Sequence, residues 1–183
     1  MDADDEACVR RTRRWVEEVI VTHSFCPFAR REVERQRIRY AVSHEAQVAG
    51  ALEVLIDECV QLDRDSRIET TLLLYPRGFD VFEGYLDFAA LAEALLVEQG
   101  YEGIYQLATF HPDYRFADAP GDDPANYTNR SPCPALHIIR EAGLEKAIAG
   151  HSDPEGIPAR NVTYARELGL KVLRELLDGI CKD

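Results

Sequence analysis

The sequence lacks the cysteine spacings that predict a disulfide framework or a zinc site. Its five cysteines are odd in number, and they form no Cys-x-x-Cys pair. Disulfide scaffolds carry even sets of cysteines, and zinc knuckles carry such pairs. We therefore expect reduced thiols and predict no metal site. A set formed by His111, Asp113 and His137 could ligate a metal, although its spacing is not specific for one.

Long hydrophobic runs are also missing. No run approaches the roughly 18–20 apolar residues of a membrane helix, and the start, Met1 to Glu6, has neither the basic nor the apolar region of a secretory leader. We expect a protein that stays in the cytoplasm and does not bind membranes.

Positive charge is scarce, because the formal net charge is −12. Nucleic acids and anionic membranes are bound through concentrated positive charge, so neither is expected as a partner. The distribution is uneven, since nine arginines and four acidic residues lie between Arg10 and Arg39. This region either attracts small anions or forms a solvated helix face that is paired with acidic neighbours.

Several catalytic motifs are absent. The chain has no Gly-x-x-x-x-Gly-Lys, no Gly-x-Gly-x-x-Gly, no Gly-x-Ser-x-Gly and no His-x-x-x-His. Nucleotide-cofactor and serine-hydrolase functions therefore have no support, and the sequence indicates no particular cofactor.

The residues that are present describe a globular protein. A chain of 183 residues that is 46% hydrophobic and 30% charged predicts one domain over residues 1–183. Hydrophobic periodicity predicts helices over residues 8–23, 45–62, 81–99, 134–149 and 158–179, and strands over 38–42, 70–75 and 104–110. This order predicts an α/β fold, with α+β as the alternative. We expect a mostly parallel or mixed sheet of about three strands in a βαβαβ core, an N-terminal helix and two C-terminal helices.

Loops that follow the predicted strands are candidate sites, because α/β folds bind ligands at the carboxyl ends of their strands. Arg77 follows the strand that ends at residue 75, and His111 and Tyr114 follow the strand that ends at residue 110. His111 could act as a general acid or base near neutral pH. Alternatively, it bonds only to the loop backbone.

The segment from 111 to 134 has no periodicity and is rich in proline, aspartate and asparagine, which is typical of a lid or a binding loop. Near the end of this segment, Ser131 is the expected N-cap of the helix over 134–149. Arg130, Asn126 and Asn129 stand near that cap and could bind an anion there. The alternative is that these side chains only order the loop.

Two further residues belong to the predicted helix over 134–149. At 100° per residue His137 and Arg140 point away from its apolar face, either into a cleft or into solvent. We keep His137 as a candidate proton-transfer group and Arg140 as a candidate anion ligand.

Cys26 is the candidate nucleophile. It precedes Pro27 and a short predicted helix with Arg30 and Arg31 one turn on, a setting that would lower the thiol pKa. A buried, inert thiol beside neighbouring phenylalanines is the structural alternative.

Four segments carry a resemblance to a known family. They are Cys26-Pro27-Phe28-Ala29, Tyr75-Pro76, the run from Gln106 to Phe116, and Asn126 to Pro132 with His137-Ile138-Ile139-Arg140-Glu141. With them the chain resembles a bacterial and plastid family of cytoplasmic proteins known as domain of unknown function 1415. The family pattern has an aromatic residue where this chain has Cys133. The resemblance implies where a site lies and assigns no reaction.

A second resemblance covers only residues 19–44. Taken as strand, helix and strand, they look like the opening of glutaredoxins and of glutathione transferases with a single active cysteine. That fold has a proline just before a later strand, whereas Pro76 and Pro112 follow theirs.

These observations predict an enzyme that acts on a small anionic metabolite at a Cys/His/Arg/Asn site built from loops at strand ends. A non-catalytic module that binds a ligand or a partner is the alternative, and a thiol-redox protein is the second alternative. The sequence does not predict the oligomeric state.

Overall fold

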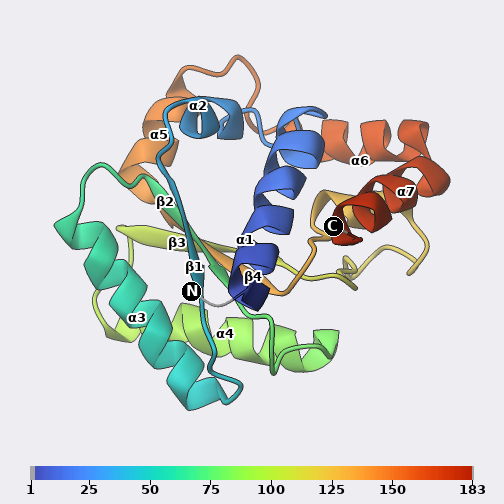
Figure 1. The fold of residues 1–183 in the computed structure, drawn as a ribbon. Coiled ribbons are helices and arrows are strands. Elements are labelled where there is room, and N and C mark those ends of the chain that lie inside the picture. Colours follow the sequence, from blue (N-terminus) through green and yellow to red (C-terminus); the bar gives the residue numbers. More distant parts are fainter. Residues whose placement is uncertain (1–2, 183) are drawn as a thin grey trace.

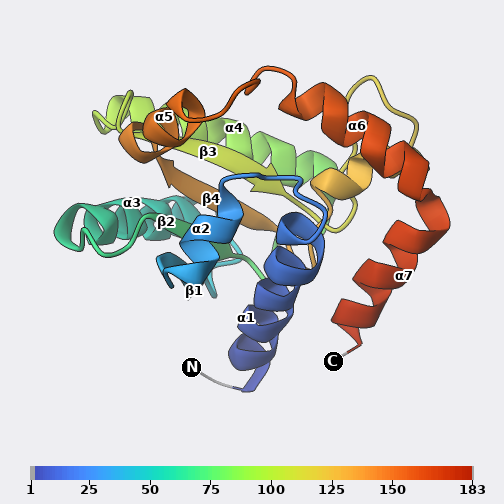
Figure 2. The same cartoon turned by 90° about the horizontal axis from the view of Figure 1, so that it is seen from above.

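The computed structural model describes residues 3–182 as one mixed sheet with helices on both faces (Figures 1 and 2). The strands are β1 (Ile38–Val42), β2 (Thr70–Leu74), β3 (Tyr105–Phe110) and β4 (Ala135–Arg140), in the order β1-β2-β4-β3. β1 is parallel to β2, and β4 is antiparallel to both of its neighbours. β1, β2 and β3 therefore run in one direction, and their carboxyl ends meet at one edge.

Helices α3 (Val48–Arg64) and α4 (Phe82–Glu98) cover one face of the sheet. The other face carries α1 (Ala3–Trp15), the π-helical segment η1 (Val16–Val21), α2 (Ala29–Glu34), α6 (Ile157–Leu168) and α7 (Leu170–Cys181). Helix α5 (Glu141–Ala149) follows β4, and the short 3₁₀ helix η2 (Pro124–Thr128) lies in the long loop. Within residues 3–182, none of the helices combines the length and the apolar character that crossing a membrane requires.

The α/β fold class is confirmed, but the helix predicted over 134–149 is wrong in its first half. Residues 135–140 form β4, which lies between β2 and β3 and makes the sheet four-stranded. Pairing on both sides satisfies the backbone of β4, and this tertiary pairing overrides local periodicity. A strand with apolar residues on both faces also imitates a buried helix in sequence. Ser131 is consequently not a helix N-cap.

Two other segments differ from the prediction. The strand that the glutaredoxin-like resemblance requires before Cys26 is helical, because residues 16–21 form η1. The helix predicted over 158–179 is two helices, so three helices rather than two close the chain. α6 and α7 meet at Gly169, whose φ of +84° lies in the left-handed region that favours glycine.

Alternation along the strands divides the core into two layers. Leu73 of β2 and Ile138 of β4 pack toward α3 and α4, whereas Leu72 and Leu74 pack toward Trp15 on α1. Because successive strand residues face opposite sides, the odd-numbered positions of β4, including 137, face the α1 side.

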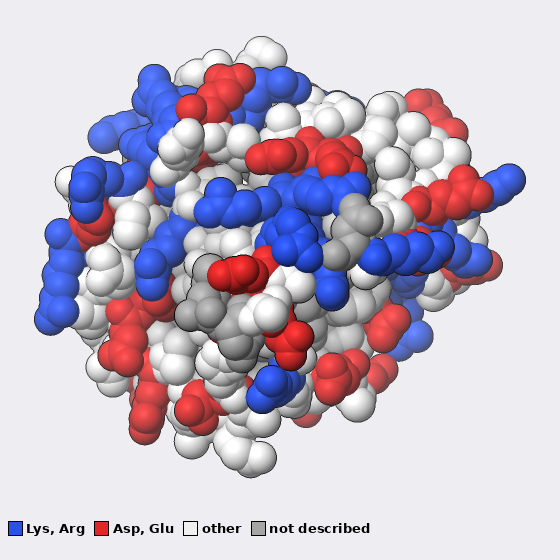
Figure 3. Space-filling model, in the orientation of Figure 1, with Lys and Arg blue, Asp and Glu red and all other residues white. Residues whose placement is uncertain are grey.

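The nine arginines between residues 10 and 39 lie on or beside α1, α2 and β1, and basic side chains gather over this part of the molecule (Figure 3). Several are paired with carboxylates: Arg14 with Glu18 at 2.8 Å, and Arg39 with Glu58 at 2.7 Å. These side chains therefore fit the second interpretation of this region, a solvated face paired with acidic neighbours, rather than a site that attracts small anions.

Tyr85 joins α4 to the strands β3 and β4. Its buried hydroxyl donates to the carbonyl of Ala135 at 2.7 Å and accepts from the N–H of Phe110 at 3.2 Å. The substitution Tyr85→Phe leaves both backbone groups without this partner, and we expect it to lower the free energy of unfolding by about 1–3 kcal/mol. Urea unfolding measures this loss. The half-exposed Tyr164 gives the control, since Tyr164→Phe should change stability by less than about 0.5 kcal/mol.

Candidate functional site

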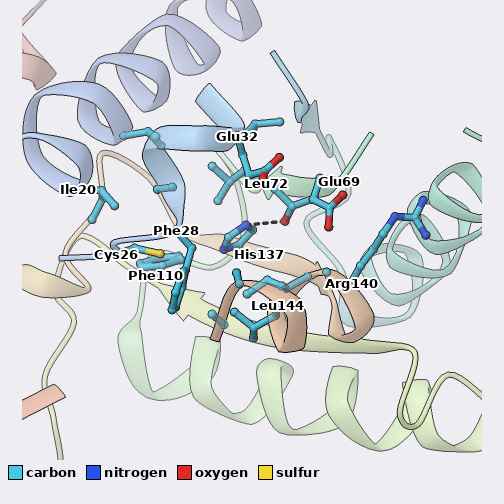
Figure 4. A pocket seen from close by; sticks show the side chains of 18 of the residues that line it. Ile20, Cys26, Phe28, Glu32, Glu69, Leu72, Phe110, His137, Arg140 and Leu144 are labelled. Atoms are coloured by element: carbon cyan, nitrogen blue, oxygen red, sulfur yellow. Dashed lines mark hydrogen bonds between the residues drawn. The ribbon is translucent and has the colours of Figure 1, made fainter. Parts of the chain in front are cut away.

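A cavity of about 220 Å³ opens between the sheet and the helices of the α1 side. Figure 4 shows its walls, which come from the end of α1, η1, the Cys26 turn, α2, all four strands and α5. The walls are largely apolar and include Trp15, Ile20, Phe28, Leu72, Phe110 and Leu144. Three of the sequence segments that carry the family resemblance meet here: those at Cys26 and at His137, and the run from Gln106 to Phe116, which contributes Phe110.

The turn that carries Cys26 is positioned by η1 and α6. The wide turn of η1 ends with the N–H of Phe25 donating to Ile20 O at 3.0 Å, and Ser24 then reverses the chain with a φ of +53°. From α6, Asn161 Nδ2 donates to Phe25 O at 2.6 Å, and Arg160 donates to Ser24 O. These bonds hold the Cys26 turn at the mouth of the cavity.

His137 lies in the floor of the cavity, at the centre of the sheet. Its neighbours in register are Leu72 of β2 and Ala108 of β3. Its Nε2 is 2.6 Å from Thr70 Oγ1, which in turn donates to Ile138 O at 2.6 Å. A hydroxyl has one hydrogen to donate, so Nε2 must carry the ring proton and donate to Thr70.

The second ring nitrogen of His137 is therefore an unprotonated acceptor. Burial in these surroundings lowers the pKa of His137 to about 4, so the ring is neutral at pH 7. Within residues 3–182 the ring bonds only through Nε2, so Nδ1 has no hydrogen-bond partner, and the ring lines the cavity (Figure 4). The cavity thus presents one free acceptor in a mainly apolar wall.

Two carboxylates, Glu32 and Glu69, lie at the polar rim of the cavity. Arg37 bridges them, with Nη2 2.7 Å from Glu32 Oε2 and Nη1 3.1 Å from Glu69 Oε2. Glu69 also lies so close to Gly143 of α5 that a methyl group at 143 would collide with its carboxylate. A side chain at position 143 would therefore have to move the Glu69 carboxylate, which is paired with Arg37.

Cys26 lines the cavity, but its thiol is not activated. Burial raises the thiol pKa and outweighs the hydrogen bonds from the backbone of Phe28 and Ala29, which lower it. Arg30 donates to a backbone carbonyl of η1 at 3.4 Å, and both Arg30 and Arg31 are exposed. The direction of the shift is therefore opposite to the lowered pKa expected from the sequence, and the thiol is protonated at pH 7.

Arg140 contributes only part of its length to the cavity. Its guanidinium turns to the α3 side, where Nε donates to Ile68 O at 3.1 Å and Nη1 donates to the Tyr105 hydroxyl at 3.2 Å. Nη2 donates to Leu62 O, near the end of α3. These bonds satisfy carbonyls at and beyond the end of a helix, and they direct the charge away from the cavity.

His111 serves to fix the loop that follows β3. It is 1% exposed and lies against the rings of Phe82 and Tyr85. Its Nδ1 accepts from the N–H of Asp113 at 3.0 Å, so Nε2 must donate to Phe79 O, at 2.9 Å. With both nitrogens engaged, His111 matches the loop-bonding alternative.

The polar residues of the long loop order that loop. Each donates to a backbone carbonyl: Asn126 to Pro120 at 2.8 Å, Asn129 to Thr109 at 3.1 Å, Arg130 to Tyr114 at 3.1 Å, and Ser131 to Cys133 at 2.6 Å. Arg130 also lies over the Tyr127 ring, 4.6 Å from its centroid. Here the loop-ordering alternative describes the contacts.

Of the residues predicted from the sequence, the structure brings Cys26, His137 and the stem of Arg140 to one cavity. Asn129 shares a neighbouring hollow with Cys26. Arg77 is exposed beside a different cavity at the carboxyl edge of the sheet, and Tyr114 packs against Phe82 and Phe116. Within residues 3–182, no three His, Cys, Asp or Glu side chains are placed to hold a metal ion.

Sequence reasoning missed two residues of this site. Trp15 lies in the helix predicted over residues 8–23 and Thr70 in the strand predicted over 70–75, and the sequence marks neither as a site residue. The indole N–H of Trp15 is buried and has no acceptor in residues 3–182. No sequence signal identifies Thr70 as the partner of His137, because that contact depends on the register of β2 and β4.

The buried neutral ring of His137 predicts a pH-dependent stability. The unfolded chain takes up a proton near pH 6.5, whereas the folded protein does so only near pH 4, so the stability from the neutral ring is complete above pH 6.5 and is lost between these values. The loss is on the order of 3 kcal/mol. We expect urea unfolding to show that, between pH 7.5 and pH 4, the free energy of unfolding falls less in His137→Gln than in the wild type. Equal losses in the two proteins would contradict the buried neutral ring.

Comparison with known proteins confirms the resemblance drawn from the sequence motifs. No curated protein and no solved structure matches the chain. One family model matches residues 7–175, which include the turn at Cys26, the strand β4 and the whole wall of the cavity. The chain belongs to this family, described as protein of unknown function (DUF1415).

Proposed function

We propose that the protein binds a small, neutral, mainly apolar molecule in the His137 cavity. The volume of about 220 Å³ is enough for a single-ring compound, since an engineered apolar cavity of ~150 Å³ binds benzene. Trp15, Phe28 and Phe110 give the walls an aromatic surface that suits such a ring. This is the ligand-binding alternative among the functions predicted from the sequence.

The free Nδ1 of His137 carries the proposal. Nδ1 lines the cavity without a protein partner, and a ligand that donates a hydroxyl or N–H hydrogen would gain a hydrogen bond there, with a net value of about 0.5–1.5 kcal/mol. The neutral state of the ring keeps Nδ1 an acceptor at pH 7. The ligand class is therefore an apolar ring or short chain with one hydrogen-bond donor.

The charges around the cavity favour a neutral ligand over the anion expected from the sequence. Glu32 and Glu69 are both paired with Arg37 at the rim, and Arg31 lies 3.9 Å from Glu32, so these arginines are already paired with carboxylates. The guanidinium groups of Arg130 and Arg140 are bound to backbone carbonyls. An enzymatic role for Cys26 as nucleophile would need a thiolate, which burial disfavours.

Phenol and toluene are matched probes for this site. Phenol has a hydroxyl that can donate a hydrogen bond to Nδ1 of His137, and toluene has a methyl group in its place. Trp15 is the single tryptophan of the chain and lines the cavity, so its fluorescence reports binding. We expect His137→Leu to lower the preference for phenol over toluene about tenfold, the equivalent of one hydrogen bond. The exposed His44 gives the control variant His44→Leu, which should keep the wild-type preference.

Two results would overturn the proposal. If neither probe changes Trp15 fluorescence or the melting temperature up to its solubility limit, the cavity is not a binding site. If both probes bind but His137→Leu keeps the wild-type preference, His137 is not the acceptor.

Filling the cavity gives an independent prediction. Ala147 lies on the α5 wall, and Ala147→Leu should occupy part of the space and weaken phenol binding at least about tenfold, without loss of stability. Calorimetric titration measures the affinity and thermal unfolding the stability. Ala149, exposed near the end of the same helix, gives the matched control, and Ala149→Leu should bind phenol as the wild type does. Equal affinities in all three proteins would place the ligand elsewhere.

A further inference from the structure

A pair of thiols lies outside the His137 cavity, at the carboxyl edge of the sheet. Cys8 on α1 and Cys133, which leads into β4, are 125 residues apart in sequence, and their sulfurs are 3.3 Å apart. Both side chains are nearly enclosed, at 8% and 9% exposed. A disulfide needs a sulfur separation of about 2.05 Å, so the sulfurs have only to approach by about 1.3 Å.

The two thiols are not equivalent. The hydrogen bond from Cys133 lowers the pKa of Cys8, and the cation of Arg11 lowers it further, against opposing effects of burial and Asp5. The same hydrogen bond and burial raise the pKa of Cys133. Cys8 is therefore the thiol of the pair that loses its proton more readily, and Cys133 is the one that keeps it.

A cavity of about 350 Å³ gives small molecules access to the pair. It lies where β1 and β2 end, and its lining includes both cysteines, Arg11, His44 and Arg77. The Nε–H of Arg11 is enclosed and has no acceptor in residues 3–182. Arg11 lines the same cavity, and its positive charge acts on Cys8.

We propose that Cys8 and Cys133 are a peroxide-reactive dithiol that forms a reversible disulfide, with Cys8 oxidised first. A hydroperoxide fits the site because both thiols line this cavity and are nearly enclosed, and hydrogen peroxide is little larger than water. The bond would fasten α1 to the segment that leads into β4.

The reaction balances with hydrogen peroxide as the oxidant. The Cys8 thiolate attacks one peroxide oxygen, the O–O bond breaks, and hydroxide leaves and takes up a proton to form water; Cys8 becomes a sulfenic acid. The Cys133 sulfur then attacks the Cys8 sulfur, the S–O bond breaks, and the departing oxygen leaves as water with the Cys133 proton. Two thiols and one peroxide give one disulfide and two waters.

Peptide mapping of the wild-type protein tests the proposal directly. Trypsin cleaves after Arg10, Arg130 and Arg140, so the disulfide would join the peptides 1–10 and 131–140. After treatment with hydrogen peroxide we expect this linked peptide, which a thiol reductant separates again. We also expect the oxidised protein to melt at a higher temperature, because the bond closes a long loop.

Substitutions separate this pair from the other thiols. Cys8→Ser and Cys133→Ser should each abolish the linked peptide, and Cys8→Ser should also abolish the sulfenic acid detected by dimedone. Cys26→Ser and Cys181→Ser are the matched controls. Both should still form the linked peptide, because Cys26 lies in the other cavity and Cys181 is exposed on α7. The proposal is overturned if peroxide oxidises Cys181 while peptides 1–10 and 131–140 stay separate in the wild type. It is also overturned if Cys133 pairs with Cys181 instead.

Discussion

The pairing of β4 on both of its edges is the constraint on which the rest of the structure depends. β4 is antiparallel to β2 on one side and to β3 on the other, so it occupies a place between strands that run parallel to each other. This position fixes His137 at the centre of the sheet and beside Thr70. It also brings Cys133, just before the strand, to the carboxyl edge where Cys8 lies.

The long loop before β4 makes that pairing possible. Its polar side chains satisfy carbonyls of the loop and of β3, so a segment without regular structure leaves few of its backbone groups unpaired. His111 and Asn126 are both nearly inaccessible, which is expected of residues that hold a loop together and unusual for residues that meet a ligand. The density of functional residue types in this loop therefore reflects its architecture.

Burial and neighbouring groups give different properties to the individual cysteines of this protein, and to its individual histidines. Cys59 lies in the α3 core, where burial raises its pKa to about 12, whereas hydrogen bonding and a cation lower the pKa of Cys8. His111 has both nitrogens bonded, whereas His137 keeps one free in an apolar cavity. Residue type alone did not separate these cases, because the separating factors come from distant parts of the chain.

The sequence by itself determined the α/β class, the three strands that follow one another with helices between them, and the family, because periodicity and local motifs carry this information. It also selected Cys26 and His137, which meet in one cavity. Only the tertiary structure decided that residues 135–140 are a strand, that Arg140 turns to the end of α3, and that Cys8 touches Cys133. The physical reason is that strand pairing, burial and thiol contacts are made between residues far apart in the chain, and such contacts leave no local pattern.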